Sequence, residues 1–149
     1  MAALGNLIWF VFGGEVLALI WLIIAGIFYV TIVGIPIGRA CLEFAKLSSF
    51  PFGKEIIREG ELVGWANQSI ANRTVAIVLN IVWLIIGIPM CIIYYVAGIL
   101  SFMTIIGIPV GIVYVRMGKF IITPFGARVV TKKQAYASAV ANEMDRRKE

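Results

Sequence analysis

The sequence predicts an all-α membrane protein with four transmembrane helices, arranged as two duplicated, kinked helical hairpins in parallel orientation. Three observations support this prediction: the composition, two long stretches almost without charge, and an internal repeat. Of the 149 residues, 61% are hydrophobic and 14% are charged, whereas soluble domains are about 45–50% apolar and about 25% charged. The composition therefore excludes an ordinary soluble domain and indicates a membrane protein.

The two stretches almost without charge predict where the hydrocarbon lies, because ionisable side chains are costly there. Residues 1–38 contain one charged side chain, Glu15, and residues 74–115 contain none. The second stretch would make a helix of roughly 63 Å, whereas one crossing of the hydrocarbon needs about 30 Å. We therefore expect a two-helix hairpin in each stretch, with turns near residues 25–26 and 97–98. Because both turns are almost apolar, shallow or re-entrant hairpins are the alternative.

The Lys and Arg residues set the expected topology, since cations accumulate on the cytoplasmic side of short loops. All of them lie in residues 39–73 and 116–149, so we expect both segments in the cytoplasm. The N terminus is expected there too, and the apolar start of the chain should be a retained helix because it lacks the positive region of a signal peptide. Both copies of the repeat would then point the same way, about a pseudo-twofold axis along the membrane normal.

The internal repeat appears when the second half of the chain is laid on the first with a shift of 73 or 74 residues. The matched segments are Asn6–Trp9 with Asn80–Trp83, Thr31–Gly38 with Thr104–Gly111, Lys46 with Lys119, and Pro51–Gly53 with Pro124–Gly126. We interpret the chain as a first repeat (1–58), a cytoplasmic linker (59–73), a second repeat (74–131) and a basic cytoplasmic tail helix (132–149).

These paired motifs resemble the YccF family, bacterial inner-membrane proteins with two copies of an inner-membrane component domain. The residues that carry the resemblance are Asn6, Trp9, Gly13, Gly14, Trp21 and the GIPIG, Lys46 and PFG elements of the first copy, with Asn80, Trp83, GIPVG, Lys119 and PFG in the second. The resemblance covers nearly the whole chain. It implies a duplicated, multi-pass protein of the bacterial inner (plasma) membrane, and it supplies no catalytic or ligand-binding residues.

Each copy contains a Gly-Ile-Pro-x-Gly motif, and proline inside an apolar helix removes a backbone donor and clashes with a carbonyl. We therefore expect a kinked helix at each motif. Such a break can line a pore or a small-ligand site, or the glycines can simply permit close packing of helices. The candidate helix breaks are Gly34, Pro36, Gly38, Gly107, Pro109 and Gly111.

Past each motif the sequence becomes amphipathic and basic, which predicts that the helix leaves the membrane. Cations there can contact lipid headgroups or surround the cytoplasmic mouth of a pore. The candidates for these contacts are Arg39, Lys46, Arg116 and Lys119.

A turn motif and a short β-branched segment then follow in each copy. The turn motifs are Pro51, Phe52 and Gly53 in the first copy and Pro124, Phe125 and Gly126 in the second. The segments after them, 56–57 and 129–130, are expected to pair across the pseudo-axis into a small cytoplasmic β ribbon.

Glu15 is the acid in the first apolar stretch, about 15 Å into the expected helix, and an ionisable group at that depth is a functional candidate. Its equivalent in the second copy is Pro89, so this feature is not duplicated. The tryptophans suit the headgroup boundary, and Trp9 and Trp83 are expected to mark its cytoplasmic side.

Residues that support catalysis are scarce. The chain has no histidine and a single aspartate, Asp145, so we expect no enzyme, cofactor or metal site. Cys41 and Cys91 lack the spacing of a metal site or redox pair. The cations lack interleaved aromatic residues, which argues against nucleic-acid binding.

Two functions then remain. The first is an oligomeric channel or small-solute or ion permease, a homo-oligomer because four short helices enclose little space. The alternative is a non-transporting structural or partner-recruiting membrane component, held by membrane lipids, whose cytoplasmic face binds another protein.

Overall fold

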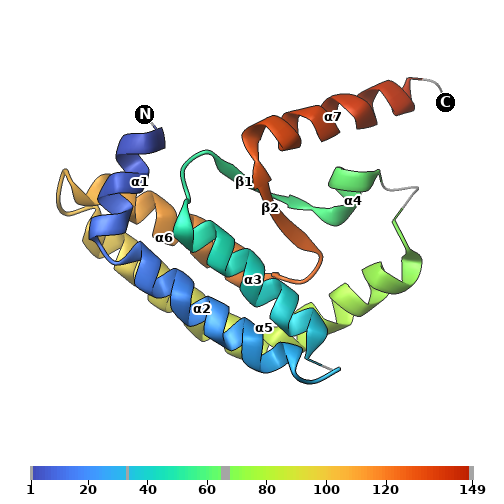
Figure 1. Ribbon diagram of the computed structural model, residues 1–149, viewed down its shortest axis with the longest axis horizontal. Helices are drawn as coiled ribbons and strands as arrows, with labels where there is room; N and C mark the ends of the chain where they lie inside the picture. Colours follow the sequence, from blue (N-terminus) through green and yellow to red (C-terminus); the bar gives the residue numbers. More distant parts are fainter. Residues whose placement is uncertain (1, 33, 65–67, 148–149) are drawn as a thin grey trace.

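A computed structural model describes residues 2–32, 34–64 and 68–147 of the chain, and it is mostly helical with one two-stranded sheet (Figure 1). Its elements in chain order are α1 (Ala2–Val11), α2 (Gly14–Tyr29), α3 (Ile35–Ser49), β1 (Lys54–Arg58), α4 (Glu59–Val63), α5 (Ile70–Ser101), α6 (Gly107–Ile122), β2 (Ala127–Thr131) and α7 (Lys132–Arg146). Both copies therefore run through a helical hairpin, a strand and a helix, which confirms the predicted duplication.

The predicted ribbon is present, and its register relates the two copies. Strands β1 and β2 pair antiparallel, and Ile56 faces Val129. These two residues occupy equivalent positions in the repeat, 73 residues apart. A pseudo-twofold axis therefore passes between them.

The turns of both hairpins lie further along the chain than expected. Helix α2 continues to Tyr29 and α5 to Ser101, so the predicted turns at residues 25–26 and 97–98 are wrong. The small residues there pack instead of breaking the helix: Ala25 is 1% exposed, and a Cβ on Gly98 would lie 3.3 Å from Val115 of α6. Small residues permit this close approach of the two helices of a hairpin.

The Gly-Ile-Pro-x-Gly motifs begin helices, so the expected kinks inside apolar helices are wrong. Pro36 is the second residue of α3 and Pro109 the third residue of α6, so both lie in the first turn of a helix. The amide that proline lacks has no partner within a helix at this position, so proline is tolerated there. The hydroxyls of Thr31 and Thr104 accept hydrogen bonds from the amides of Gly34 and Gly107, at 3.1 and 3.0 Å.

The glycines of these motifs lie where a side chain would collide with the turn. A Cβ on Gly34 would lie 2.3 Å from the carbonyl oxygen of Phe28, and one on Gly107 would lie 2.0 Å from that of Ser101. Gly38 and Gly111 lie against the aromatic rings of Tyr29 and Phe102. These contacts favour the packing interpretation of the motif.

The first apolar stretch is bent, whereas its counterpart is continuous. Helices α1 and α2 meet at an angle of 77°, because Gly13 adopts a left-handed conformation with φ +88°. The equivalent Gly87 lies inside α5, whose 32 residues make it long and apolar enough to cross a membrane. The bent pair passes that test only as one unit, and no other helix in the described ranges passes it.

Each hairpin is fastened to its Pro-Phe-Gly turn by an asparagine. The side chain of Asn6 accepts a hydrogen bond from the amide of Phe52 at 3.0 Å and donates to its carbonyl oxygen at 3.2 Å. Asn80 makes the same two bonds with Phe125, both at 3.0 Å. The asparagines match in the repeat because both perform this clamp.

The matched tryptophans also join helices, through the hydrogen bonds of their indole N–H groups. Trp9 is 2% exposed and its Nε1 donates to the carbonyl oxygen of Ser48. Trp83 donates to the equivalent carbonyl of Ile121 at 2.8 Å. The prediction that Trp9 marks the membrane boundary is therefore wrong, because its indole N–H is used inside the protein. Trp65 lies outside the described residues.

Stacked aromatic rings form the centre of the core. Trp21 of α2 stacks on Phe44 of α3 at 4.5 Å between centroids, and Phe44 contacts Phe120 of α6 at 4.2 Å. Since α3 and α6 belong to different copies, this stack joins the two hairpins across the pseudo-axis.

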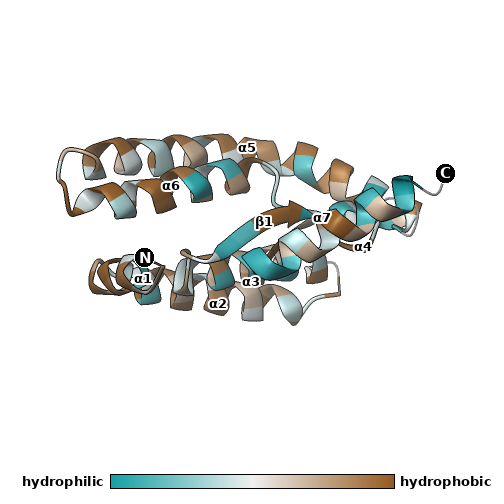
Figure 2. Ribbon diagram, turned by 90° about the horizontal axis from the view of Figure 1, so that it is seen from above, coloured by the Kyte–Doolittle hydropathy of each residue, from teal (hydrophilic) through white to brown (hydrophobic). Residues whose placement is uncertain are grey.

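The two hairpins run in opposite directions (Figures 1 and 2). The start of α3, at Ile35, lines a cavity together with Val75 near the start of α5. The end of α5, at Ala97, lines another with Leu17 near the start of α2. Each hairpin turn thus lies beside the base of the other hairpin, and the expected parallel arrangement is wrong because the antiparallel ribbon sets the directions.

The asparagine clamp generates a prediction about stability. Asn80→Ala removes two hydrogen bonds and leaves the backbone groups of Phe125 without partners, so the free energy of unfolding should fall by about 1–3 kcal/mol. The measurement is denaturant unfolding of the purified chain in detergent.

Asn72→Ala is the matched control, because Asn72 is exposed on the same helix. It should change stability by less than about 0.5 kcal/mol. If Asn72→Ala and Asn80→Ala lowered the free energy of unfolding equally, the stabilising role of the asparagine clamp would be wrong.

Candidate functional site

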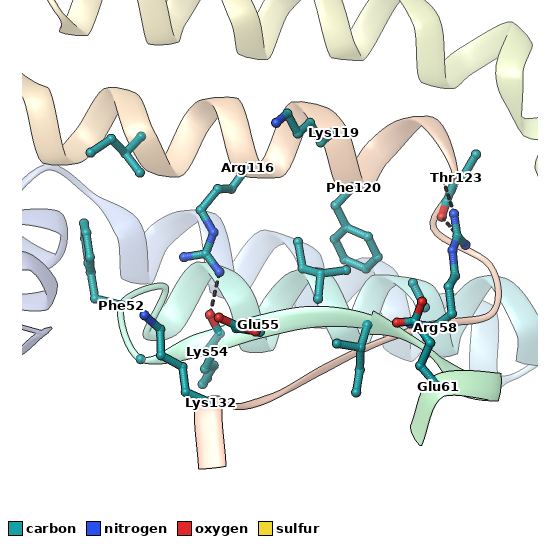
Figure 3. Close-up of a pocket in the computed structure, with 15 residues that line it drawn as sticks. Phe52, Lys54, Glu55, Arg58, Glu61, Arg116, Lys119, Phe120, Thr123 and Lys132 are labelled. Atoms are coloured by element: carbon teal, nitrogen blue, oxygen red, sulfur yellow. Dashed lines mark hydrogen bonds between the residues drawn. The ribbon is translucent and has the colours of Figure 1, made fainter. Parts of the chain in front are cut away.

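The ribbon and the second helix of each hairpin enclose two pockets at equivalent positions of the repeat. The first lies between β1 and α6 and has a volume of about 690 Å³ (Figure 3). The second lies between β2, α3 and α5 and has a volume of about 140 Å³. A shift of 73 positions brings seven of the fifteen lining residues of the first pocket onto lining residues of the second.

The first pocket is strongly basic. Its lining includes five Lys or Arg residues and two Glu residues. Figure 3 shows Arg116 reaching from α6 to β1, with Lys132 at the same end of the pocket and Arg58 and Glu61 at the other. The guanidinium of Arg116 donates to the carbonyl oxygens of Pro51 at 2.7 Å and Lys54 at 2.6 Å.

The far end of this pocket is closed by Arg58. Its guanidinium donates to the hydroxyl of Thr123 at 2.7 Å and to the carbonyl oxygens of Thr123 and Phe125. Arg58 and Arg116 therefore each bind the turn of the opposite copy, and they hold the ribbon against α6.

The second pocket is closed by an ion-pair network. Glu43 of α3 is 3% exposed and accepts a hydrogen bond from the amide of Val129 at 2.8 Å. Its carboxylate lies 2.8 Å from Lys46 and 3.6 Å from Arg128. Arg128 also pairs with Glu59 at 3.0 Å. A buried carboxylate is tolerated because these partners compensate its charge.

The pKa values of the ribbon cations reflect this difference between the pockets. The hydrogen bond to Glu59 raises the pKa of Arg128, and burial only partly opposes it. Burial and the neighbouring Lys46 lower the pKa of Lys54, although Glu43 and Glu15 act in the opposite direction. The Lys54 ammonium also donates a hydrogen bond to the carbonyl oxygen of Lys46.

The predicted cations are divided between the two pockets. Arg116 and Lys119 line the first pocket, and Arg39 lines the second. Lys46 takes part in the network at Glu43. The structure therefore does not collect all four around one opening.

Glu15 lies in the first turn of α2, just after the bend at Gly13, and is partly exposed. The expectation that it lies in the middle of a straight helix is wrong, because the chain turns two residues before it. A carboxylate in the first turn of a helix interacts favourably with the helix dipole. The charge of Glu15 also acts to raise the pKa of Lys54 of β1.

Several residues of these pockets are not identified by the sequence alone, among them Glu43, Lys54, Glu55, Arg58, Glu59, Arg128 and Lys132. The signal that could have found some of them is the repeat itself. At the 73-residue shift, Glu43 falls on Arg116, and such an exchange of charge at equivalent positions indicates two sites with different roles.

Comparison with known proteins identifies the family. The inner membrane component domain of the YccF family matches the chain twice, over residues 4–54 and 78–127. The chain belongs to the YccF family. It is 38% identical over 138 residues to the inner membrane protein YccF of Escherichia coli (strain K12). These aligned residues make up 92% of this chain and 93% of that protein. The same figures hold for the inner membrane protein YccF of Shigella flexneri. No solved structure matches the chain significantly.

The two YccF matches end at equivalent residues, Lys54 and Ala127, which begin the two strands. Each match therefore contains one hairpin, its asparagine and tryptophan contacts and its Pro-Phe-Gly turn. Most of the ribbon and the helices after it lie outside the matched ranges.

The buried carboxylate of this YccF chain generates a second prediction. Glu43→Ala leaves the amide of Val129 buried without an acceptor, so the free energy of unfolding should fall by about 1–3 kcal/mol. Glu43→Gln keeps an acceptor oxygen and loses only the charge, so its effect should be smaller. Denaturant unfolding of both variants in detergent is the measurement, and equal losses would show that the hydrogen bond to Val129 is unimportant.

Proposed function

We propose that the chain is a component of the bacterial inner membrane, embedded from the cytoplasmic side through the outer faces of α2 and α5. The observation that carries this proposal is the exposure of apolar side chains over about half the circumference of both helices. They are Val16, Leu19, Ile20, Leu22, Ile23 and Ile27 on α2, and Val82, Ile85, Ile86, Ile92, Ile93, Val96, Ile99 and Leu100 on α5. An apolar surface of this extent is stable in lipid.

The position of the polar elements supports one orientation. Helices α4 and α7 and the ribbon lie on the opposite side of α3 and α6 from α2 and α5 (Figure 1), and Figure 2 shows the hydrophilic colouring gathered on β1, α3 and α7. If the hairpins ran along the membrane normal, the ribbon beside them would carry Lys54, Arg58 and Arg128 into the hydrocarbon, which is costly. With the pseudo-axis along the normal, all these cations face the cytoplasm.

This orientation places α2 and α5 along the membrane plane. A helix with its side chains is about 10–12 Å thick, and one leaflet contributes about half of the roughly 30 Å of hydrocarbon. The helices therefore fit within a single leaflet. We propose this re-entrant arrangement in place of four spans.

For the role of the protein, we propose a non-catalytic structural or partner-recruiting component. Among the described residues, Glu43 and Ser48 are buried and hydrogen-bonded, and the other buried polar groups include the indole N–H groups of Trp9 and Trp21 and the phenol of Tyr94, which lie on largely apolar rings. A single chain therefore offers no polar path through its core. Helices α4 and α7 present polar surfaces to a cytoplasmic partner.

An oligomeric channel or permease is the second candidate. The observation that favours it is the apolar face of α2 and α5, which a second copy of the chain could cover in place of lipid. Such a homo-oligomer would have to build its pathway between subunits.

Cysteine labelling tests the orientation. In a chain whose Cys41 and Cys91 are replaced by alanine, Ile32→Cys and Ile105→Cys place single thiols at the two hairpin turns, where Ile32 and Ile105 are each 87% exposed. A membrane-impermeant maleimide added outside cells with a permeable outer membrane should label neither thiol, because both lie in lipid.

Tyr136→Cys on α7 is the control and should be labelled only after the inner membrane is opened. Detergent unfolding should make all three thiols reactive. Labelling of either hairpin turn from outside would support spans and overturn the re-entrant arrangement.

Liposome flux separates the two candidate functions. We expect vesicles that contain the purified chain to retain K⁺ and Cl⁻ as well as empty vesicles do, since the core lacks a polar path. The measurement is ion-selective fluorescence of dye-loaded vesicles. A flux that rises with the protein-to-lipid ratio would favour the oligomeric channel.

A further inference from the structure

The two pockets have diverged in charge although they arose by duplication. At equivalent positions the sign of the charge is reversed three times. The reversed pairs are Arg116 with Glu43, Lys132 with Glu59, and Glu55 with Arg128. In the second pocket the three members form the network of Glu43, Arg128 and Glu59, and Lys46 supplies the second cation that balances the two carboxylates.

In the first pocket, the described residues form no such ion-pair network. Its equivalent members are two cations and one carboxylate, and Glu55 is exposed. Within the described ranges, no hydrogen bond or ion pair involves the side-chain ammonium group of Lys119 or Lys132, and both residues are exposed. Glu55 lines this pocket, and its charge opposes the lowering of the Arg116 pKa that burial causes. Among the described residues it forms no ion pair with these cations, so their charge is less fully compensated than that of Arg128 in the second pocket.

The size and walls of the first pocket suit a small ligand with an apolar part. Its volume of about 690 Å³ falls within the usual range of ligand sites, about 300–1,000 Å³, whereas the second pocket is too small. Ile112 and Phe120 of α6 form one wall next to the basic end. Arg and Lys side chains are the usual partners of phosphate oxygens.

We propose that the pocket between β1 and α6 binds the phosphate of an anionic phospholipid headgroup, with Arg116 and Lys132 at one end of the pocket as the phosphate contacts and Lys119 as a further cation on the α6 side. This rests on the proposed orientation, which puts the pocket between the apolar helices α2 and α5 and the polar helices α4 and α7, at headgroup level. Arg116 is already held in place by the carbonyls of Pro51 and Lys54, so it is oriented before the ligand arrives.

The test uses the full chain in neutral detergent and measures binding by a shift in thermal unfolding. The probes are dihexanoyl-phosphatidylglycerol, dihexanoyl-phosphatidylcholine and inorganic phosphate. We expect saturable binding of phosphatidylglycerol and much weaker binding of phosphatidylcholine, whose headgroup carries its own cation. Saturation by inorganic phosphate without a response to phosphatidylglycerol would overturn the lipid source, and no response to any probe would overturn the site.

The variant Lys119→Gln with Lys132→Gln should weaken phosphatidylglycerol binding by about ten-fold or more, since each cation near an anionic lipid contributes about 1 kcal/mol. Replacement of both residues by arginine should retain binding. The matched control is Lys133→Gln with Arg146→Gln, which removes the same charge from exposed positions of α7 that line neither pocket. An equal loss in the control would mean a nonspecific effect of net charge and would overturn the proposal.

Flotation with neutral phosphatidylcholine vesicles separates this proposal from the one on which it rests. If the Lys119→Gln, Lys132→Gln variant loses phosphatidylglycerol binding but still floats with the vesicles, only the pocket is affected. If the unaltered chain does not float, the proposed contact of the apolar face of α2 and α5 with lipid is wrong.

Discussion

The antiparallel pairing of β1 with β2 is the constraint on which the rest of the structure depends. Because Ile56 faces its own equivalent, Val129, the two copies are related by a twofold rotation about this pair. The rotation sets the hairpins in opposite directions and places each strand against the helix of the other copy. Both pockets, the aromatic stack at Phe44 and the contacts of Arg58 and Arg116 follow from this one register.

The features that repeat in the sequence could be predicted from it, because equivalent residues keep equivalent contacts. The duplication and the pairing of residues 56–57 with 129–130 are of this kind. The hairpin turns could not be placed, since Ala25 and Gly98 allow a break and close packing equally well. The relative direction of the two hairpins could not be predicted from the charges either. The positions of the cations indicate a side of the membrane, but not how one hairpin runs relative to the other.

Only some residues of the candidate site could be predicted from the sequence, for a related reason. Arg116 and Lys119 attract notice as cations after an apolar stretch. Glu43 does not, because its role depends on the amide of Val129 and on Arg128, which lie far away along the chain. The charge reversals become meaningful only when the ribbon shows that the two sets of residues occupy equivalent pockets.

The register of the ribbon also constrains how the protein is made. Lys54 pairs with Thr131, so the first strand has no partner until β2 has left the ribosome. Contacts this distant along the chain form slowly. The first hairpin therefore precedes its strand partner in synthesis, and the ribbon that joins the two copies can close only after the second hairpin has been made.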